Sequence, residues 1–217
     1  MKVFACLATS LDGRLGPAGV TTFSRITSEA DMRHLAKVRN QAQVTVFGGE
    51  TFRTYPKEHR PADPDHRLTH VILSRKVAFD WSAPLFQSGA RIVIASPFPC
   101  KAWSDTQSDP SESILLSGDD PIRDVETILG WCEEEGYSDI LVEGGGTIFE
   151  QFLAADRIDD LYLTLAPILI ADPESPALIP GHISLLENVH FKLLDCREEK
   201  GDVFLHYRLI RQALNHR

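Results

Sequence analysis

Three consecutive glycines interrupt the stretch "ILVEGGGTIFEQFL", between an apolar run and the helical pattern that follows it. Glycine destabilises the interior of a strand or a helix, so a cluster at this junction indicates a turn that something approaches closely. The first N–H groups of a helix have no partner within the helix and favour an anion, which makes a nucleotide phosphate one candidate. A tight turn without a ligand is the other interpretation, and this stretch alone leaves both open.

Apolar runs alternate with helical patterns along the rest of the chain. We predict strands at residues 2–9, 44–49, 70–74, 91–96, 114–117, 140–143 and 161–169. The segment 190–211 indicates two further strands joined around Gly201, an antiparallel hairpin. This order predicts a mostly parallel central sheet with helices on both faces and an antiparallel edge. We therefore expect one α/β domain over residues 1–211 and a flexible tail at 212–217.

Two helices have boundaries that the sequence marks. Residues 27–42 form a helical pattern that Ser28 is placed to cap, and a stripe from Asp31 to Ala42 falls on one face. Residues 119–136 begin with aspartate and proline and end with glycine, which are the start and stop signals of a helix.

The composition narrows the classes of function. A formal net charge of −9 disfavours nucleic acid and anionic membranes as partners. The N-terminus does not resemble a signal peptide, and no apolar run reaches about 20 residues, so we expect a cytoplasmic protein without a membrane partner. The four cysteines are far apart in the sequence, and we predict neither a metal site nor a disulfide framework.

A second glycine turn has the same form as the first. In "VFGGETFR" a strand ends in two glycines, and the hydroxyl residue Thr51 follows. Two such strand ends are suited to hold one extended, phosphorylated ligand from two sides. In "ILSRK", Ser74 and Arg75 end another strand, at the position where ligands bind in open α/β sheets. A hydroxyl beside a guanidinium suits the 2′-phosphate of NADP, although a solvated turn explains the same residues.

Four motifs together resemble a known superfamily. "TSLDGRLG", "FGGETFR", "VILSRK" and "ILVEGGGTIFEQFL" follow the order and approximate spacing of the dihydrofolate reductase superfamily. More closely, nearly the whole chain resembles the C-terminal reductase domain of the bifunctional riboflavin-biosynthesis deaminase–reductase. The resemblance implies a dihydrofolate reductase-like fold, a homodimer and an NADPH-dependent reductase. Its substrate in that family is a phosphorylated heterocycle, a ribosylamino-pyrimidinone 5′-phosphate, which is reduced at C1′ to the ribitylamino form.

The resemblance also assigns residues to the cofactor and to the substrate. Those implied for NADPH are Ala8, Thr51, Ser74, Arg75, Gly144, Gly145, Gly146 and Thr147, with Arg75 reaching the 2′-phosphate. Arg39 and Glu143 are implied for the substrate, and Glu143 is the catalytic candidate. No metal is implied.

Arg39 and Glu143 also fit these roles chemically. Arg39 is suited to a bidentate grip on a substrate phosphate, although a surface arginine at a helix C-terminus is the commoner case. Glu143 ends an apolar strand, where a carboxylate is costly to bury without a partner. It is placed to accept hydrogen bonds from the substrate or to move a proton, and a cap for the next helix is the alternative.

The chain departs from the riboflavin-type pattern on the substrate side. Cys6 stands where that family usually has a lysine, and Arg25 where it has an aromatic residue. The segment "TYPKEHRPADP", which we expect to be an exposed loop, replaces one rich in aspartate and proline. These changes leave the NADPH assignment intact and the substrate open.

Two other functions therefore stay open. One is reduction of a pterin or folate-like heterocycle, because dihydrofolate reductases place a catalytic aspartate near the start of this helix, where Asp31 lies. Ser28 and Asp31 also resemble a capping box, which explains Asp31 without a substrate and which we prefer. The other is a sensor that binds NADPH without turnover.

Overall fold

The computed structural model describes residues 1–19, 25–98, 111–183 and 189–211. The strands are β1 (Lys2–Thr9), β2 (Val44–Gly48), β3 (Thr69–Leu73), β4 (Ile92–Ser96), β5 (Ser111–Leu115), β6 (Asp139–Gly144), β7 (Asp160–Leu165), β8 (His190–Glu199) and β9 (Asp202–Ile210). The helices are α1 (Glu29–Arg39), α2 (Gly49–Thr54), α3 (Pro121–Glu134) and α4 (Gly146–Ala154). In these ranges, no helix is long and apolar enough to cross a membrane.

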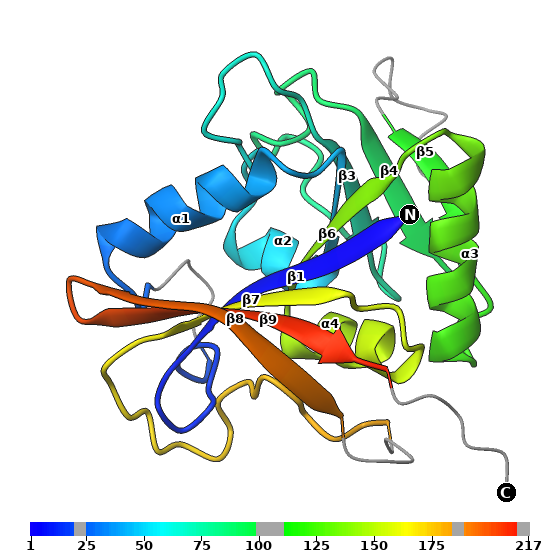
Figure 1. Cartoon of the computed structure of the whole chain (residues 1–217). Helices are drawn as coiled ribbons and strands as arrows, with labels where there is room; N and C mark the ends of the chain where they lie inside the picture. Colours follow the sequence, from blue (N-terminus) through cyan, green and yellow to red (C-terminus); the bar gives the residue numbers. More distant parts are fainter. Residues whose placement is uncertain (20–24, 99–110, 184–188, 212–217) are drawn as a thin grey trace, which may run out of the picture.

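The strands form one sheet in the order β5-β4-β3-β2-β6-β1-β7-β9-β8. The first seven strands in this order are parallel to one another. β9 runs antiparallel to both β7 and β8, so the C-terminal hairpin forms the far edge of the sheet (Figure 1). The prediction of a mostly parallel sheet with an antiparallel edge is therefore confirmed.

Successive residues of the strands alternate between two cores. On β1, Ala5 and Leu7 join the core that α3 and α4 cover, whereas Phe4 and Cys6 join a core with Val38 of α1. Figure 1 shows α1 and α3 on opposite sides of the sheet. The predicted helices on both faces are thus confirmed, and the alternation fixes which strand residues point toward α1.

The capping signals in the sequence are used as expected. Ser28 Oγ accepts a hydrogen bond from the N–H of Ala30 at the start of α1. Asp120 accepts from two N–H groups at the start of α3, and Gly136 follows that helix with a φ of +79°. A left-handed residue at this position satisfies the last carbonyls of a helix, which is why glycine stands there.

Several boundaries differ from the prediction. β7 ends at Leu165 rather than at residue 169, because Pro167 has no N–H to donate to the ladder. β5 lies at Ser111–Leu115 rather than at 114–117. The six-residue helix α2 was not predicted, because it is too short to show a helical period. The predicted tail at 212–217 lies outside the described residues.

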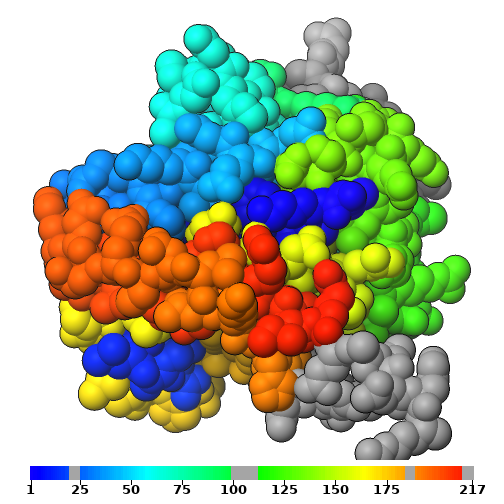
Figure 2. Space-filling model, viewed as in Figure 1, coloured from blue at the N-terminus to red at the C-terminus, as the bar shows by residue number. Residues whose placement is uncertain are grey.

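The space-filling view shows how the hairpin meets the first helix. The β8–β9 hairpin covers the near face beside α1 (Figure 2). An ion pair of 2.8 Å joins Arg33 of α1 to Glu199 of β8. Both side chains are exposed, and a surface pair of this kind contributes about 0–1 kcal/mol, so the contact orients the hairpin more than it stabilises it.

Candidate active site

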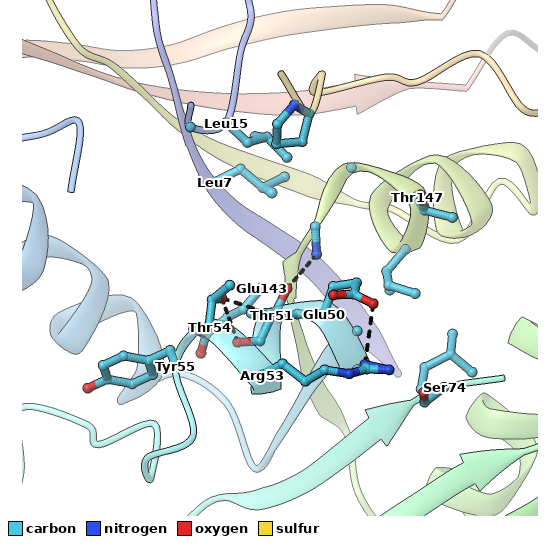
Figure 3. A pocket seen from close by; sticks show the side chains of 18 of the residues that line it. Leu7, Leu15, Glu50, Thr51, Arg53, Thr54, Tyr55, Ser74, Glu143 and Thr147 are labelled. Carbon is cyan, nitrogen blue, oxygen red and sulfur yellow. Dashed lines mark hydrogen bonds and ion pairs between the residues drawn. The ribbon is translucent and has the colours of Figure 1, made fainter. Parts of the chain in front are cut away.

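A cavity of about 1110 Å³ lies at the carboxyl ends of the parallel strands. Its lining includes ten of the eleven site residues expected from the sequence, and Gly144 is the exception. β6 and β1 lie between β2 and β7 in the sheet, so the order of the strands reverses here. Open α/β sheets bind their ligands at such a point. Figure 3 shows Ser74 and Thr147 on one side of the cavity and Tyr55 on the other.

Two of the three glycines are required by the protein itself. Gly144 has a φ of +90°, and a Cβ there would lie 2.7 Å from Leu7 Cδ2. A Cβ on Gly146 would collide with the carbonyl oxygen of Ala177. Neither residue needs a ligand to explain it.

Gly145 is different from its neighbours. A Cβ there would meet only Leu15 Cδ1 at 3.8 Å and Thr51 Oγ1 at 4.0 Å, which are ordinary contacts. The N–H of Gly145 donates to Thr51 Oγ1 at 3.0 Å, so the two glycine turns predicted from the sequence meet at this bond (Figure 3). Gly145 lines the cavity, and α4 begins at the next residue. Its bare backbone leaves room for a ligand against the start of the helix.

One end of the cavity carries several cations. Ser74 is buried, and its hydroxyl donates to the carbonyl of Lys76 at 2.8 Å. Arg75 and Lys76 are exposed and line the cavity. The sequence analysis missed Arg53, which lies two residues after Thr51 in the same glycine motif and points toward Ser74 (Figure 3).

The guanidinium of Arg53 is incompletely paired. Its buried Nη1 has no hydrogen-bond partner among the described residues, and the nearest carboxylate, that of the exposed Glu50, is 3.4 Å away. A buried donor without a partner costs free energy, so an anion at this end of the cavity would satisfy it.

Glu143 lies deeper in the cavity and is held on both oxygens. Arg39 Nε donates to Oε1 at 2.8 Å, and Arg39 Nη2 donates to Oε2 at 2.6 Å. Thr45 Oγ1 also donates to Oε1 at 3.0 Å, and His59 Nδ1 lies 3.0 Å from Oε2. Burial raises the pKa of this carboxyl, but the charge of Arg39 and the contact with His59 outweigh it and hold the pKa of Glu143 well below its usual range.

This pairing changes two interpretations of the sequence. Arg39 directs its two parallel donors at Glu143, and its Nη1 donates to the carbonyl of Arg60 at 3.3 Å, which argues against a grip on a substrate phosphate. Glu143 is not a helix cap, because the cap residue of α4 is Gly145, without a side-chain bond. Both residues line the cavity as expected, but they are paired with each other.

His59 was not found by the sequence analysis. It lies in the proline-rich segment that we expected to be an exposed loop, yet it is only 2% exposed. Its ring stacks on Phe47 with 4.2 Å between centroids, and its backbone N–H donates to His70 Nε2 at 3.1 Å. Burial lowers the pKa of His70 to about 3, and the neighbouring His59 contributes. The only local signal was a histidine in a segment otherwise typical of a surface.

Asp31 does not complete a capping box, so the interpretation we preferred is wrong. The N–H of Ser28 donates to Asp202 Oδ2 at 2.8 Å instead of to Asp31. Asp31 Oδ2 accepts from Thr27 Oγ1 at 2.8 Å and lines the cavity. Burial raises the pKa of Asp31, and the charge of Asp202 adds to this effect. A buried carboxyl of raised pKa that faces a cavity is a candidate for ligand contact.

The fold and the cavity at the carboxyl edge of its sheet define a dihydrofolate reductase-like α/β domain. Dihydrofolate reductase from Enterococcus faecalis superposes with a TM-score of 0.53 and 15% identity, covering 96% of each chain. RibD from Acinetobacter baumannii superposes with a TM-score of 0.76 and 20% identity, covering 97% of this chain and 58% of that one.

The chain belongs to the RibD C-terminal domain family, whose model matches residues 1–205. It is 22% identical over 209 residues to 2,5-diamino-6-ribosylamino-4(3H)-pyrimidinone 5′-phosphate reductase of Archaeoglobus fulgidus, with 91% of both chains covered. It is 28% identical over 186 residues to riboflavin biosynthesis protein RibD of Bacillus amyloliquefaciens, covering 80% of this chain and 47% of that protein. The chain thus spans about half the length of that RibD.

Proposed function

We propose that this chain is an NADPH-dependent reductase that converts a ribosylamino-pyrimidinone 5′-phosphate to its ribitylamino form. The observation that carries the proposal is one continuous cavity with a cationic end at Ser74 and Arg75 and a cluster of buried charged groups around Glu143. The first end suits the phosphates of a dinucleotide and the second a polar heterocycle. The reductase of Archaeoglobus fulgidus, which this chain matches over 91% of its length, supports the same substrate.

The residues present fit a nicotinamide cofactor. Gly145 has room where a side chain would stand, and α4 begins beside it with the N–H groups of Gly146 and Thr147. Thr51, Thr147 and Ala8 line the same part of the cavity. When bound, the dihydronicotinamide supplies the hydride. The protein binds and orients both ligands and keeps water away from the reacting carbon.

The cationic end supports NADPH rather than NADH. Arg75 and Lys76 are exposed and can approach a phosphate, and the buried Nη1 of Arg53 has no hydrogen bond in the described part of the chain, only a 3.4 Å ion-pair contact with the exposed Glu50. Three cations beside the hydroxyl of Ser74 suit the 2′-phosphate that distinguishes the two cofactors. The dihydrofolate reductase of Enterococcus faecalis, which shares the fold, is a complex with NADP(H).

The substrate phosphate is then best assigned to Arg25. Arg25 is exposed, lines the cavity and lies close enough to Asp31 for its charge to lower that carboxyl's pKa, against the larger effect of burial. Arg39, which the sequence suggested for this phosphate, is paired with Glu143. An arginine in place of the usual aromatic residue thus supplies the charge that the pairing of Arg39 removes.

The proposal is tested by turnover with the purified chain. We expect NADPH to be oxidised only when the ribosylamino-pyrimidinone phosphate is present, with a product that has gained one hydride and one proton by mass spectrometry. NADPH binding without turnover of this substrate or of dihydropterin would contradict the proposal and favour a sensor.

A pterin or folate-like substrate stays a second candidate because of one observation. Asp31 is not used in a capping box and is buried against the cavity with a raised pKa. An acid at this position suits a heterocycle that must be held by its ring nitrogens. Turnover of dihydropterin, lost in Asp31→Asn and unaffected by Arg25→Ala, would favour this candidate.

We also propose a homodimer that works in the cytoplasm, with residues 1–211 as its reductase domain. β8 is an edge strand, and its Leu193 and Leu194 are 48% and 40% exposed. An exposed edge with apolar side chains favours pairing with a second copy. Among the described cysteines Cys6, Cys132 and Cys196 are all free thiols, which suits a reducing compartment.

A further inference from the structure

Most acceptor positions of Glu143 are taken by protein groups. A carboxylate offers about four lone-pair sites on its two oxygens. Arg39 occupies one on each oxygen and Thr45 a second on Oε1, and His59 Nδ1 lies 3.0 Å from Oε2 in an ion-pair contact. The pKa of Glu143 is held well below its usual range, so this carboxyl also carries no proton to give. The catalytic role that the sequence suggested for Glu143 therefore has to be taken by a group that it holds.

His59 is the group that Glu143 leaves with a free atom. Both ring nitrogens are buried without a hydrogen bond among the described residues, but Nδ1 lies 3.0 Å from Glu143 Oε2 and forms an ion-pair contact with it. His59 is one of the residues that line the cavity, so its ring lies at the wall of the space that a substrate would fill. A carboxylate on one ring nitrogen fixes the tautomer and leaves the other nitrogen for chemistry.

The surroundings hold this ring in one orientation. Phe47 stacks on it at 4.2 Å, and Tyr55 is tilted against it with 5.6 Å between centroids. His70 meets it edge-on at 5.7 Å and accepts the backbone N–H of the same residue. Burial lowers the pKa of His70 to about 3, which favours the neutral form of its ring.

We propose that His59 is a catalytic residue of this reductase, which donates its Nε2 proton to the substrate while Glu143 and Arg39 position the imidazole. The inference rests on the proposed function, because it assigns the proton that the reduction consumes. Sequence position gave no indication of the dyad, since β3, β4, β5 and α3 lie between His59 and Glu143 in the chain.

The proposed step balances in atoms and charge. The C1′–O4′ bond of the ribosylamine breaks, and O4′ keeps the electron pair and takes the Nε2 proton of the imidazolium form of His59, which leaves the ring neutral with its proton on Nδ1. C1′ becomes the carbon of an iminium, whose nitrogen belongs to the pyrimidine amine. That carbon is reduced by one hydride, for which NADPH is the reductant, and a neutral secondary amine results. The neutral imidazole regains its proton from solvent before the next turnover.

Several charged and titratable groups surround the ring. Glu143, Arg39 and His70 influence one another electrostatically at this point, and Cys6 is close enough for its thiol pKa to respond to Glu143. Burial raises the pKa of Cys6 well above its usual value, so this thiol stays neutral. By position, His59 is the member of this cluster that contacts Glu143 and has ring nitrogens without a hydrogen-bond partner in the described part of the chain.

Two substitutions separate proton donation from packing. An asparagine at this position keeps an N–H where Nδ1 stood and lacks the second nitrogen, whereas an alanine removes both. We expect His59→Asn to lower kcat by roughly a hundred- to ten-thousandfold, the usual range for a general acid, with the KM for NADPH changed less than threefold. His66→Gln is the matched control, because His66 lies in the same loop, outside the cavity lining.

A second measurement does not depend on turnover. The ¹⁵N NMR signals of His59, assigned by their loss in His59→Asn, should show the neutral ring protonated at Nδ1 and bare at Nε2. Proton on Nε2 in the neutral ring would overturn the dyad whatever the activity. A His59→Asn enzyme with wild-type kcat would overturn proton donation. If the wild-type chain turns over no ribosylamino-pyrimidinone phosphate but shows the Nδ1–H tautomer, the proposed substrate fails while the dyad stands.

Discussion

At the scale of single residues, the three glycines that first marked this sequence have three different causes. Gly144 and Gly146 are needed because Leu7 and the carbonyl of Ala177 approach them closely. Only Gly145 leaves its open side to the cavity. A cluster that the sequence presents as one motif is therefore one binding position between two packing positions.

This division predicts opposite outcomes for neighbouring substitutions. Gly145→Val should keep the fold and weaken NADPH binding at least tenfold, about 1.4 kcal/mol, because its side chain enters ligand space. Gly146→Val should lower the melting temperature, because its side chain meets the backbone at Ala177. Calorimetric titration and thermal unfolding of both variants measure this. Normal NADPH affinity in a folded Gly145→Val would rule out a cofactor at this turn.

The cations beside Ser74 predict the choice of cofactor. Arg75→Ala and Arg53→Ala should each weaken NADPH binding by roughly 1.5–3 kcal/mol, the worth of a hydrogen bond to a charged group, and leave NADH binding nearly unchanged. Fluorescence titration with both cofactors compares the two affinities. Equal losses for NADPH and NADH in both variants would place the 2′-phosphate elsewhere.

Replacing Asp31 should stabilise the folded state and weaken function. Its pKa is raised by burial, so the folded state is penalised as pH rises above the unfolded value of 3.8, and the penalty is complete above the raised folded value. Asp31→Asn removes the charge and should raise the free energy of unfolding at pH 7 by about 0.5–1 kcal/mol, with no gain at pH 3. Urea unfolding at the two pH values tests the sign, and a loss of stability at pH 7 would contradict the assigned shift.

At the scale of elements, the sequence showed what local patterns can show. Apolar runs located the strands, and Ser28, Asp120 and Gly136 marked helix ends because capping is a contact between near neighbours. The pair of Arg39 and Glu143 joins α1 to β6 across 104 residues. No local sequence pattern spans so many residues. It becomes visible only when the register sets β6 between β2 and β1 and alternation turns Glu143 toward α1.

Thr45 is a site residue that the register of the strands would have been enough to predict. It is paired with Leu141 on the neighbouring strand, so it faces α1 two residues before the level of Glu143. A known sheet order and simple alternation are enough to find it. His59 is a different case, because it comes from a loop and no periodicity places a loop residue.

The ion pair between α1 and β6 predicts how stability depends on pH. Arg39→Ala leaves the buried carboxylate of Glu143 without its main partner and should cost about 3–5 kcal/mol at pH 7. The depressed pKa of Glu143 makes its contribution complete above the ordinary value of 4.5 and lost as pH falls through the folded value. The difference between wild type and Arg39→Ala in urea unfolding should therefore shrink below pH 4.5. A constant difference down to pH 3 would show that packing, not charge, is what Arg39 contributes.

At the scale of the whole molecule, helices pack on both faces of the sheet and its two edges are uncovered strands of the described chain. β5 and β8 are its outer strands, and β8 carries the exposed Leu193 and Leu194 on the hairpin that lies beside α1 (Figure 2). If a second copy covers this edge, the stability of each domain includes that contact. Leu193→Lys should then convert a dimer to a monomer, because a charge on an edge strand opposes pairing.

Sedimentation equilibrium of wild type and Leu193→Lys measures this directly. The cavity lies at the carboxyl edge of the parallel strands, and its lining contains no residue of β8. The monomeric variant should therefore bind NADPH with unchanged affinity, while its melting temperature falls and no longer rises with protein concentration. Leu115→Lys is the matched control, because Leu115 is 65% exposed on the opposite edge strand. A wild-type chain that stays monomeric at high concentration would remove the dimer, and a dimer lost only in Leu115→Lys would move its interface to β5.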